Sequence, residues 1–311
     1  MSTHRLSLIA ASRAGDIGDA AIASACAAFA DAGAPAWLSP RRACELPVSV
    51  YNTVAEHESL VRLRADLEQQ RIDVNLLPVA GRRKRLLIAD MDSTIVEQET
   101  LDELADVLGR RAEVAAITEQ AMRGDLNFRA ALRARIALVA GAPASVIDEV
   151  ARRIRHVPGA ATLVAVMCAD GAFAALVSGG FSELVGRTAG LLGFDAFQAN
   201  RFLIRDDRIV GVAEPILDKQ AKLQALGDYT AARGLTPADA LAVGDGANDV
   251  PMLQAAGLGV AFRAKPAVRA AVPVQVNQGD LTALLYLQGY GDLDIAQAGA
   301  RAAEDAIIAR G

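Results

Sequence analysis

Two patterns of hydrophobic and polar positions follow one another along the chain. Up to about residue 80, short apolar strands and amphipathic helices are separated by Gly, Pro and Asp. The expected elements are, in order, a strand at 5–10, a helix at 16–32, strands at 36–38 and 46–51, a helix at 56–70 and a strand at 72–79. This βαββαβ order is typical of a ferredoxin-like α+β domain, a small sheet with both helices on one face. We expect such a domain over residues 1–80.

The second pattern begins after a basic linker at 82–85. Short, wholly apolar strands alternate there with longer amphipathic helices, which is typical of a parallel, Rossmann-like α/β sheet. The strand candidates are 85–89, 173–177, 240–243 and 258–262. About eighty residues separate the first two strands, more than one crossover helix needs, and they keep a helical period from 101 to about 154. We therefore predict an α/β domain over residues 81–311 with an inserted helical cap at about 101–155.

Two smaller features complete the pattern. Residues 201–212 predict a hairpin that turns at Asp206 and Asp207. The stretch from Gly291 onward is Ala-rich and mildly amphipathic, which predicts a final helix.

The composition is that of a soluble globular chain. Of the 311 residues, 52% are hydrophobic and 22% charged, and 32 Lys and Arg against 37 Asp and Glu give a net charge of −5. This negative balance, with scattered basic residues, argues against nucleic-acid binding. The apolar runs are shorter than the roughly 20 residues of a membrane span, and no signal peptide is recognisable, so we expect a cytoplasmic protein with no membrane partner. The three scattered cysteines predict neither a disulfide framework nor a zinc site.

Acidic residues come directly after the first strand of the α/β domain. Asp90 and Asp92 are two positions apart, so strand alternation turns both carboxyl groups to one side, at the edge where open α/β sheets bind ligands. Two like charges this close repel each other unless a cation lies between them or one is protonated. Mg²⁺ prefers such hard oxygen ligands and often shares them with a substrate phosphate. The pattern therefore predicts a Mg²⁺ site.

Two further strands end in residues that suit the same chemistry. The strand at 173–177 runs into 178–180 (SGG) just before a helix, and a hydroxyl, flexible amides and a helix N-terminus together suit phosphate oxygens. Lys222, near the start of a later helix, can add a fixed positive charge. The strand at 240–243 runs into 244–249 (GDGAND), which brings more acids to the same edge.

These segments together resemble the four motifs of the haloacid dehalogenase superfamily. Residues 90–94 (DMDST), 178–180 (SGG), Lys222 and 244–249 (GDGAND) occur in the order and spelling of that family. Each is weak evidence alone, because a lone DxD is more often a turn and a helical Lys is usually a surface charge. Their joint order makes the match highly specific.

Within this superfamily the chain resembles the phosphoserine phosphatases over about residues 86–290. The added matches are residues 95–103, residues 121–128 and Arg135. Phosphoserine carries a phosphate, an ammonium and a carboxylate, so a selective pocket needs an acid for the amine and preferably a guanidinium for the carboxylate. The resemblance implies that Glu99 and Arg135 fill these two roles.

The resemblance also implies an apolar lid formed by Met122 and Phe128. Taken alone, both would be core residues of a helix, and Arg135 would be a solvated helix residue. The implied activity is hydrolysis of O-phospho-L-serine to serine and phosphate, the last step of serine biosynthesis. The cap is expected to close over this small-molecule substrate and exclude bulk water.

The implied mechanism has two steps. Asp90 attacks phosphorus and forms an aspartyl-phosphate, while Asp92 acts as general acid towards the leaving serine and then as general base for water. Ser178, the Gly179 amide and Lys222 neutralise the phosphoryl oxygens. The groups expected to hold Mg²⁺ or to orient ligands around it are the Asp90 carboxylate, the Asp92 main-chain carbonyl, Asp245, Asn248 and Asp249.

Other functions compete with this interpretation. An enzyme of the same chemistry could act on another small phosphomonoester, or transfer the phosphoryl group to an alcohol such as homoserine, because Glu99 and Arg135 indicate only an amino-acid phosphate. An amino-acid sensor with an inert core is disfavoured, since unused clustered acids would only cost stability. Neither a GxSxG nor a GxxxxGK[ST] motif occurs, which argues against serine-hydrolase and P-loop chemistry.

The role of the N-terminal domain stays open. ACT domains, which sense small ligands, look similar to it, but many unrelated modules share this topology. A spacer or a homodimerisation module is an equally good interpretation, and a homodimer through this domain is one expected assembly.

Overall fold

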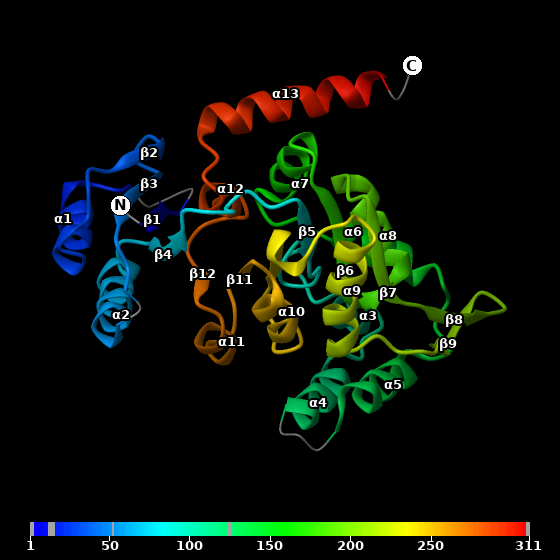
Figure 1. Cartoon of the computed structure of the whole chain (residues 1–311). Helices are drawn as coiled ribbons and strands as arrows, with labels where there is room; N and C mark the ends of the chain where they lie inside the picture. The colour runs from blue at the N-terminus through cyan, green and yellow to red at the C-terminus, as the bar shows by residue number, and fades with distance from the viewer. Residues whose placement is uncertain (1–2, 12–15, 52, 123–125, 309–311) are drawn as a thin grey trace.

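The computed structural model describes residues 3–11, 16–51, 53–122 and 126–308. A small antiparallel sheet lies beside a larger parallel sheet, and a group of helices extends from the larger one (Figure 1). This arrangement confirms the predicted fold class, an α/β core with a helical cap that follows an α+β unit. Among the described residues, no helix is long and apolar enough to cross a membrane.

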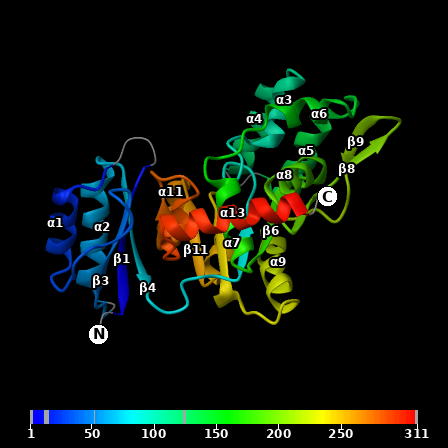
Figure 2. The same ribbon diagram turned by 90° about the horizontal axis from the view of Figure 1, so that it is seen from above.

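The N-terminal sheet has the strand order β2-β3-β1-β4 and carries both of its helices on one face (Figure 2). Its core consists of apolar side chains that alternate along the strands, such as Leu6 and Leu8, packed against the helices. The elements are β1 (His4–Ala10), α1 (Asp19–Ala28), β2 (Ala36–Ser39), β3 (Ala43–Val48), α2 (Val54–Glu68) and β4 (Ile72–Pro78).

The prediction for β3, 46–51, was wrong by three residues at each end, since the strand ends at Val48. The strand begins at Ala43 rather than at 46, and it includes the acidic Glu45. Glu45 is only 5% exposed because it forms an ion pair with Arg82, which lies far along the chain. The sequence pattern does not reveal this distant partner, so it gives no reason to place a charged residue inside a buried strand. The predicted first helix, 16–32, is also shorter in the structure, since α1 begins at Asp19 and ends at Ala28.

The larger sheet is parallel, with the order β12-β11-β10-β5-β6-β7. Its central strands are short and fully buried, as their wholly apolar sequences predict. The strands are β5 (Leu86–Ala89), β6 (Phe173–Phe181), β7 (Ala196–Asn200), β10 (Ala240–Gly244), β11 (Leu258–Phe262) and β12 (Val274–Val276). The edge strands β7 and β12 were missed, because they are short and partly exposed and lack a continuous apolar run.

Helices cover both faces of this sheet (Figures 1 and 2). One face packs against α7 (Ala160–Ala169), α8 (Ser182–Leu192) and α12 (Ala283–Leu287), and α13 (Asp292–Ile308) packs on α7. The other face packs against α9 (Lys219–Ala231), α10 (Val250–Ala255) and α11 (Pro266–Ala271). The predicted final helix corresponds to α13, which lies along α7.

The inserted cap has its own hydrophobic core, which also takes in Phe181 and Leu184 from the parallel-sheet unit. The predicted helical stretch consists of α3 (Thr100–Val107), α4 (Arg111–Met122), α5 (Phe128–Val139) and α6 (Val146–Arg153). The predicted hairpin is confirmed as β8 (Phe202–Arg205) and β9 (Arg208–Val212), with both turn residues at positive φ. This hairpin packs on α5 and extends the wall of the cap.

Candidate active site

The carboxyl ends of three adjacent strands meet beneath the cap. In the sheet, Ala89 at the end of β5 pairs with Val243 of β10 on one side and with Leu176 of β6 on the other. The residues that follow these strands therefore come together at one edge, as the parallel topology requires. They are Asp90 after β5 and Asp245 after β10, together with residues 178–180, which the structure includes in the last part of β6.

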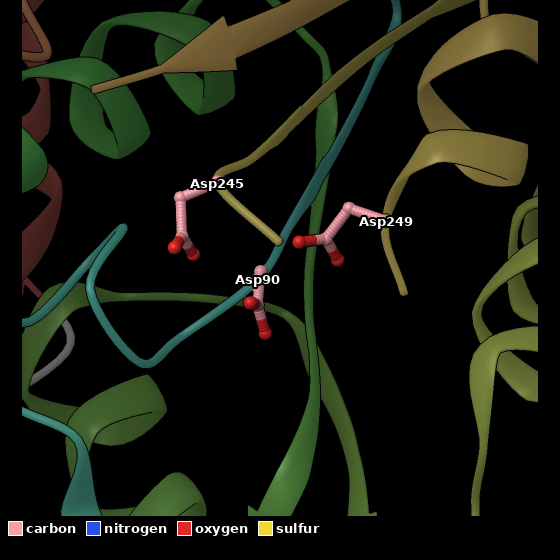
Figure 3. Close-up of side chains that lie close together, drawn as sticks. All are labelled: Asp90, Asp245 and Asp249. Carbon is pink, nitrogen blue, oxygen red and sulfur yellow. The ribbon is translucent and has the colours of Figure 1, made fainter. Parts of the chain in front are cut away.

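Three buried carboxylates lie close together at this edge (Figure 3). Asp90, Asp245 and Asp249 each offer an oxygen, and these atoms lie within 4.8 Å of one another. Burial and the neighbouring Asp249 raise the pKa of Asp90, although Lys222 opposes this rise. Burial and Asp249 also raise the pKa of Asp245, to about 6. The cluster could hold a metal ion, because hard oxygen donors whose charges repel one another are stabilised by a cation.

Lys222 supplies one positive charge to this cluster. Its Nζ lies 2.7 Å from Asp90 Oδ1 and 2.6 Å from Asp249 Oδ1, and the side chain is only 3% exposed. Burial opposes the charge on Lys222, but Asp90 and Asp249 outweigh burial and raise the pKa of the lysine. The second oxygen of Asp249 accepts a hydrogen bond from the Gly246 amide at 3.0 Å. Asp249 is therefore held in direct contact with Lys222.

The side chain of Asp92 lies against the start of the cap. Its oxygens accept hydrogen bonds from the Thr100 hydroxyl, at 2.9 and 3.1 Å, and from the Thr100 amide at 3.2 Å. Burial, followed by the charge of Glu99, raises the pKa of Asp92 to about 7. A carboxyl group that keeps its proton near neutral pH can act as a general acid.

The serine–glycine segment at the end of β6 is shaped by local contacts. The Gly180 amide donates to Ser178 Oγ at 2.9 Å. A side chain at Gly180 would come within 3.3 Å of the Thr100 hydroxyl and 3.1 Å of Ser178 Oγ, so glycine keeps this approach open. The buried Asn200 donates to the Gly179 carbonyl at 2.8 Å and accepts from the Leu217 amide at 2.8 Å.

A cavity of about 270 Å³ opens over these groups between the core and the cap. The predicted residues on its wall are Asp90, Asp92, Glu99, Phe128, Arg135, Ser178, Gly179, Asp245 and Asn248. Lys222 lies beneath this wall, where it borders a smaller cavity together with Ser178 and Asn248. Met122 is the last residue of α4, and its side chain lies outside the described part of the structure.

Two predicted cap residues, Arg135 and Phe128, line this cavity. Among the described residues, Arg135 Nε is buried without a hydrogen-bond partner, and burial lowers the pKa of the guanidinium while Asp102 and Glu99 oppose the decrease. Phe128 lies directly over the serine–glycine segment, since a Cβ built on Gly179 would be 3.3 Å from its Cζ. Glu99 accepts a hydrogen bond from the Ser93 hydroxyl at 2.7 Å.

Sequence reasoning missed several residues of this site. Thr94 donates to Asp245 Oδ1 at 3.3 Å, and its hydroxyl within the DMDST motif was an available signal. Asn200 was missed because β7 was missed. Lys265 lines the cavity and its charge opposes the rise in the pKa of Asp245, yet its sequence context is that of an ordinary loop lysine.

A parallel sheet that gathers carboxylates, a buried lysine and an amide-rich segment under an inserted helical cap defines a capped α/β hydrolase. The model of the haloacid dehalogenase-like hydrolase family matches residues 87–254, more than half of the chain. The chain belongs to this family.

Several phosphoserine phosphatases are similar in sequence to this chain. Phosphoserine phosphatase SerB2 of Mycobacterium tuberculosis is 42% identical over 224 residues, which are 71% of this chain and 55% of that protein. A phosphoserine phosphatase of Streptococcus thermophilus is 44% identical over 199 residues, 64% of this chain and 93% of that protein. A haloacid dehalogenase family hydrolase from Salmonella enterica serovar Typhi superposes with a TM-score of 0.81 at 30% identity, over 91% of this chain and 98% of that one. This chain thus spans about half the length of the mycobacterial relative and nearly all of the streptococcal one.

Proposed function

We propose that the chain is a Mg²⁺-dependent phosphatase that hydrolyses O-phospho-L-serine to serine and phosphate, the last step of serine biosynthesis. The observation that carries the proposal is the buried, unpartnered Nε of Arg135 on the same cavity wall as Glu99 and Asp90, within the described residues. A guanidinium for a carboxylate, an acid for an ammonium and a nucleophile for a phosphate are the three groups that phosphoserine requires. The names of the mycobacterial and streptococcal relatives support the same substrate.

In this proposal Asp90 is the nucleophile. Its carboxylate attacks phosphorus in line, the bond from phosphorus to the serine oxygen breaks, and an aspartyl-phosphate forms. The Lys222 ammonium, 2.7 Å from Asp90 Oδ1, favours the ionised form of this carboxylate and holds it in place before the attack. Asp90 then leaves when water attacks the phosphoryl group.

Asp92 moves the proton in both steps. With a pKa of about 7, it is partly protonated at neutral pH and can donate to the leaving serine oxygen. The resulting carboxylate then accepts a proton from the attacking water, which restores the starting state. The Thr100 hydroxyl and amide fix the orientation of this carboxyl group throughout.

The donor set fits a magnesium ion, because Asp90 and Asp245 are buried carboxylates whose pKa values are raised in its absence. These two carboxylates and the Asp92 main-chain carbonyl would hold Mg²⁺, with Asp249 and Asn248 beside them. When bound, the ion supplies positive charge to the phosphoryl oxygens. Ser178, the Gly179 amide and Lys222 would stabilise the negative charge on the same oxygens.

The cap selects the substrate in this proposal. Glu99 binds the ammonium group of phosphoserine and Arg135 binds its carboxylate, while Phe128 and Met122 shield the site from bulk water. We also propose residues 1–80 and 81–311 as the two domains, with the cap at about 101–155. The separate core of the N-terminal sheet supports this boundary. The cytoplasmic location and the homodimer stay predictions.

Phosphate release from phosphoserine, phosphothreonine and phosphoethanolamine tests this proposal. We expect phosphoserine to have the highest kcat/KM with Mg²⁺, and chelator to abolish release. The same assay with added homoserine separates a hydrolase from a transferase, because only a transferase forms phosphohomoserine. No release from any of these esters would contradict the proposal and favour a sensor with an inert core.

A further inference from the structure

A buried acid of the N-terminal sheet is bound by the backbone of the larger domain. Asp73 on β4 is only 5% exposed. Its carboxylate accepts hydrogen bonds from the consecutive amides of Asn277 (2.8 Å), Gln278 (3.1 Å) and Gly279 (2.8 Å). We call residues 277–279, which follow β12, the amide turn. Successive amides that converge on one anion form a strong and directional contact.

The neighbouring residue Asn75 strengthens the same junction. Its side-chain Nδ2 donates to the Gln275 carbonyl at 2.7 Å, and its Oδ1 accepts from the Gln275 amide at 2.8 Å. The asparagine thus pairs with both main-chain groups of Gln275 in β12, the strand at one end of the parallel sheet. Strand β4 thereby holds both the last strand of this sheet and the amide turn.

The amide turn is connected to the cavity through Arg263. The Arg263 amide donates to the Val276 carbonyl at 2.7 Å, and its Nη2 donates to the Gly279 carbonyl at 3.0 Å. Arg263 has a φ of 45°, in the left-handed region that is strained for a residue with a side chain. Its contacts with the amide turn therefore help to hold a backbone conformation that the residue would not adopt by itself.

The loop that begins at Arg263 reaches the candidate metal site two residues later. The Lys265 amide donates to the main-chain carbonyl of Asp245 at 3.4 Å, and Lys265 lines the same cavity as Asp90. A continuous series of contacts thus leads from Asp73 through the amide turn and Arg263 to the residue that carries the Asp245 carboxylate.

We propose that Asp73 is a positioning residue for the active site. Through the amide turn and Arg263 it holds residues 263–265, and with them the Asp245 side of the metal site. The N-terminal domain therefore contributes to the geometry of the active site. The inference rests on the proposed function in one respect, namely that the acidic cluster binds Mg²⁺.

The test compares Asp73→Ala with Glu45→Gln in the full chain. Glu45→Gln weakens the same domain interface, but its partner Arg82 contacts main-chain carbonyls at the end of α12 and not the amide turn. We expect Asp73→Ala to reduce hydrogen-exchange protection of the Arg263 and Lys265 amides at least about tenfold. It should also raise the Kd for Mg²⁺, measured by calorimetry, about fivefold. Glu45→Gln should leave both quantities within about twofold.

Two further variants keep the inference falsifiable if Asp73→Ala folds poorly. Asp73→Asn retains one acceptor oxygen and should give intermediate values. Arg263→Gly relieves the strained φ and removes the guanidinium, so adding Asp73→Ala to it should change the Kd for Mg²⁺ by less than about twofold. Equal effects of Asp73→Ala and Glu45→Gln, or additive effects in the Arg263→Gly background, would overturn the inference.

The same measurements separate this inference from the proposed function. Hydrogen exchange of the two loop amides needs neither metal nor substrate. If the unaltered protein fails to bind Mg²⁺ or to hydrolyse phosphoserine, the proposed function fails, whatever the exchange result. If it does both and the loop amides are insensitive to Asp73→Ala, the positioning role alone fails.

Discussion

The buried Asp90 carboxylate contacts a lysine and also lies close to two other carboxylates. It lies 2.7 Å from a lysine ammonium and within 4.8 Å of two other acids. Asp90→Asn keeps the shape of the side chain but removes the proposed nucleophile, so we expect kcat to fall by at least about 10⁴-fold. Lys222 retains its partner Asp249, and the fold should therefore persist, with a melting temperature in circular dichroism close to that of the unaltered protein. Retained turnover would refute the nucleophile assignment.

Arg135 is the residue by which the proposed substrate can be tested most directly. Arg135→Met removes the guanidinium that is expected to bind the substrate carboxylate. Because a hydrogen bond to a charged group contributes about 1.5–3 kcal/mol, kcat/KM for phosphoserine should fall roughly 10- to 100-fold. Phosphoethanolamine lacks the carboxylate, so its kcat/KM should change little, which makes it the internal control. A parallel loss for both esters would mean that Arg135 supports the cap rather than the substrate.

At the residue scale, the sequence predicted the groups whose position follows from strand ends. Asp90 and Asp245 come together because parallel strands end at one edge, and no knowledge of side-chain contacts is needed for that conclusion. Asn200 and Lys265 could not be predicted in this way. Each has a spacing typical of an exposed polar residue, and each meets the site only through chain folding over long distances in sequence.

At the scale of elements, helix α5 ties the cap to the core through exposed ion pairs. Arg129 contacts Asp218, which caps α9, at 2.9 Å, and Arg133 contacts Glu214. Exposed pairs contribute about 0–1 kcal/mol each, so their loss should weaken cap closure without unfolding the domain. We expect the double variant Arg129→Gln and Arg133→Gln to raise KM for phosphoserine about two- to fivefold, with kcat unchanged or higher if product release is slow.

Salt provides an independent check on these pairs. Screening by added salt should raise KM in the unaltered enzyme, and it should do so less in the double variant, in which the pairs are already absent. An equal salt dependence in both proteins would show that the ion pairs do not contribute to closure. A chloride series at constant Mg²⁺ and pH measures the difference.

Strands that are buried on both faces of the sheet could be predicted from the sequence. Partly exposed edge strands could not. The central strands β5 and β10 are buried on both faces and therefore have wholly apolar sequences. The edge strands β7 and β12 have five residues or fewer, too few for a period to emerge, and in β7 only Asn200 is buried. Strand β12 also receives hydrogen bonds from the N-terminal domain, because Asn75 pairs with the main chain of Gln275.

At the scale of the whole molecule, the buried acids couple stability to pH. The pKa of Asp92 is raised to about 7 and that of Asp245 to about 6, above the values near 4 expected in the unfolded chain. The folded state therefore binds these protons more tightly than the unfolded state. The stabilisation is fully present below about pH 4, and it is lost as the pH rises to about 7.

Magnesium should reverse this loss, because it binds the deprotonated carboxylates and competes with protons. We expect the increase in melting temperature on replacing chelator with Mg²⁺ to be larger at pH 7.5 than at pH 5.5, where a fixed Mg²⁺ concentration is a smaller multiple of the apparent Kd. In Asp92→Asn, which cannot titrate at this position, the fall in metal-free stability between pH 5 and 7 should be smaller than in the unaltered protein. Thermal melts of both proteins across this range provide the measurement, and a magnesium shift that is independent of pH would show that the clustered acids do not bind the ion.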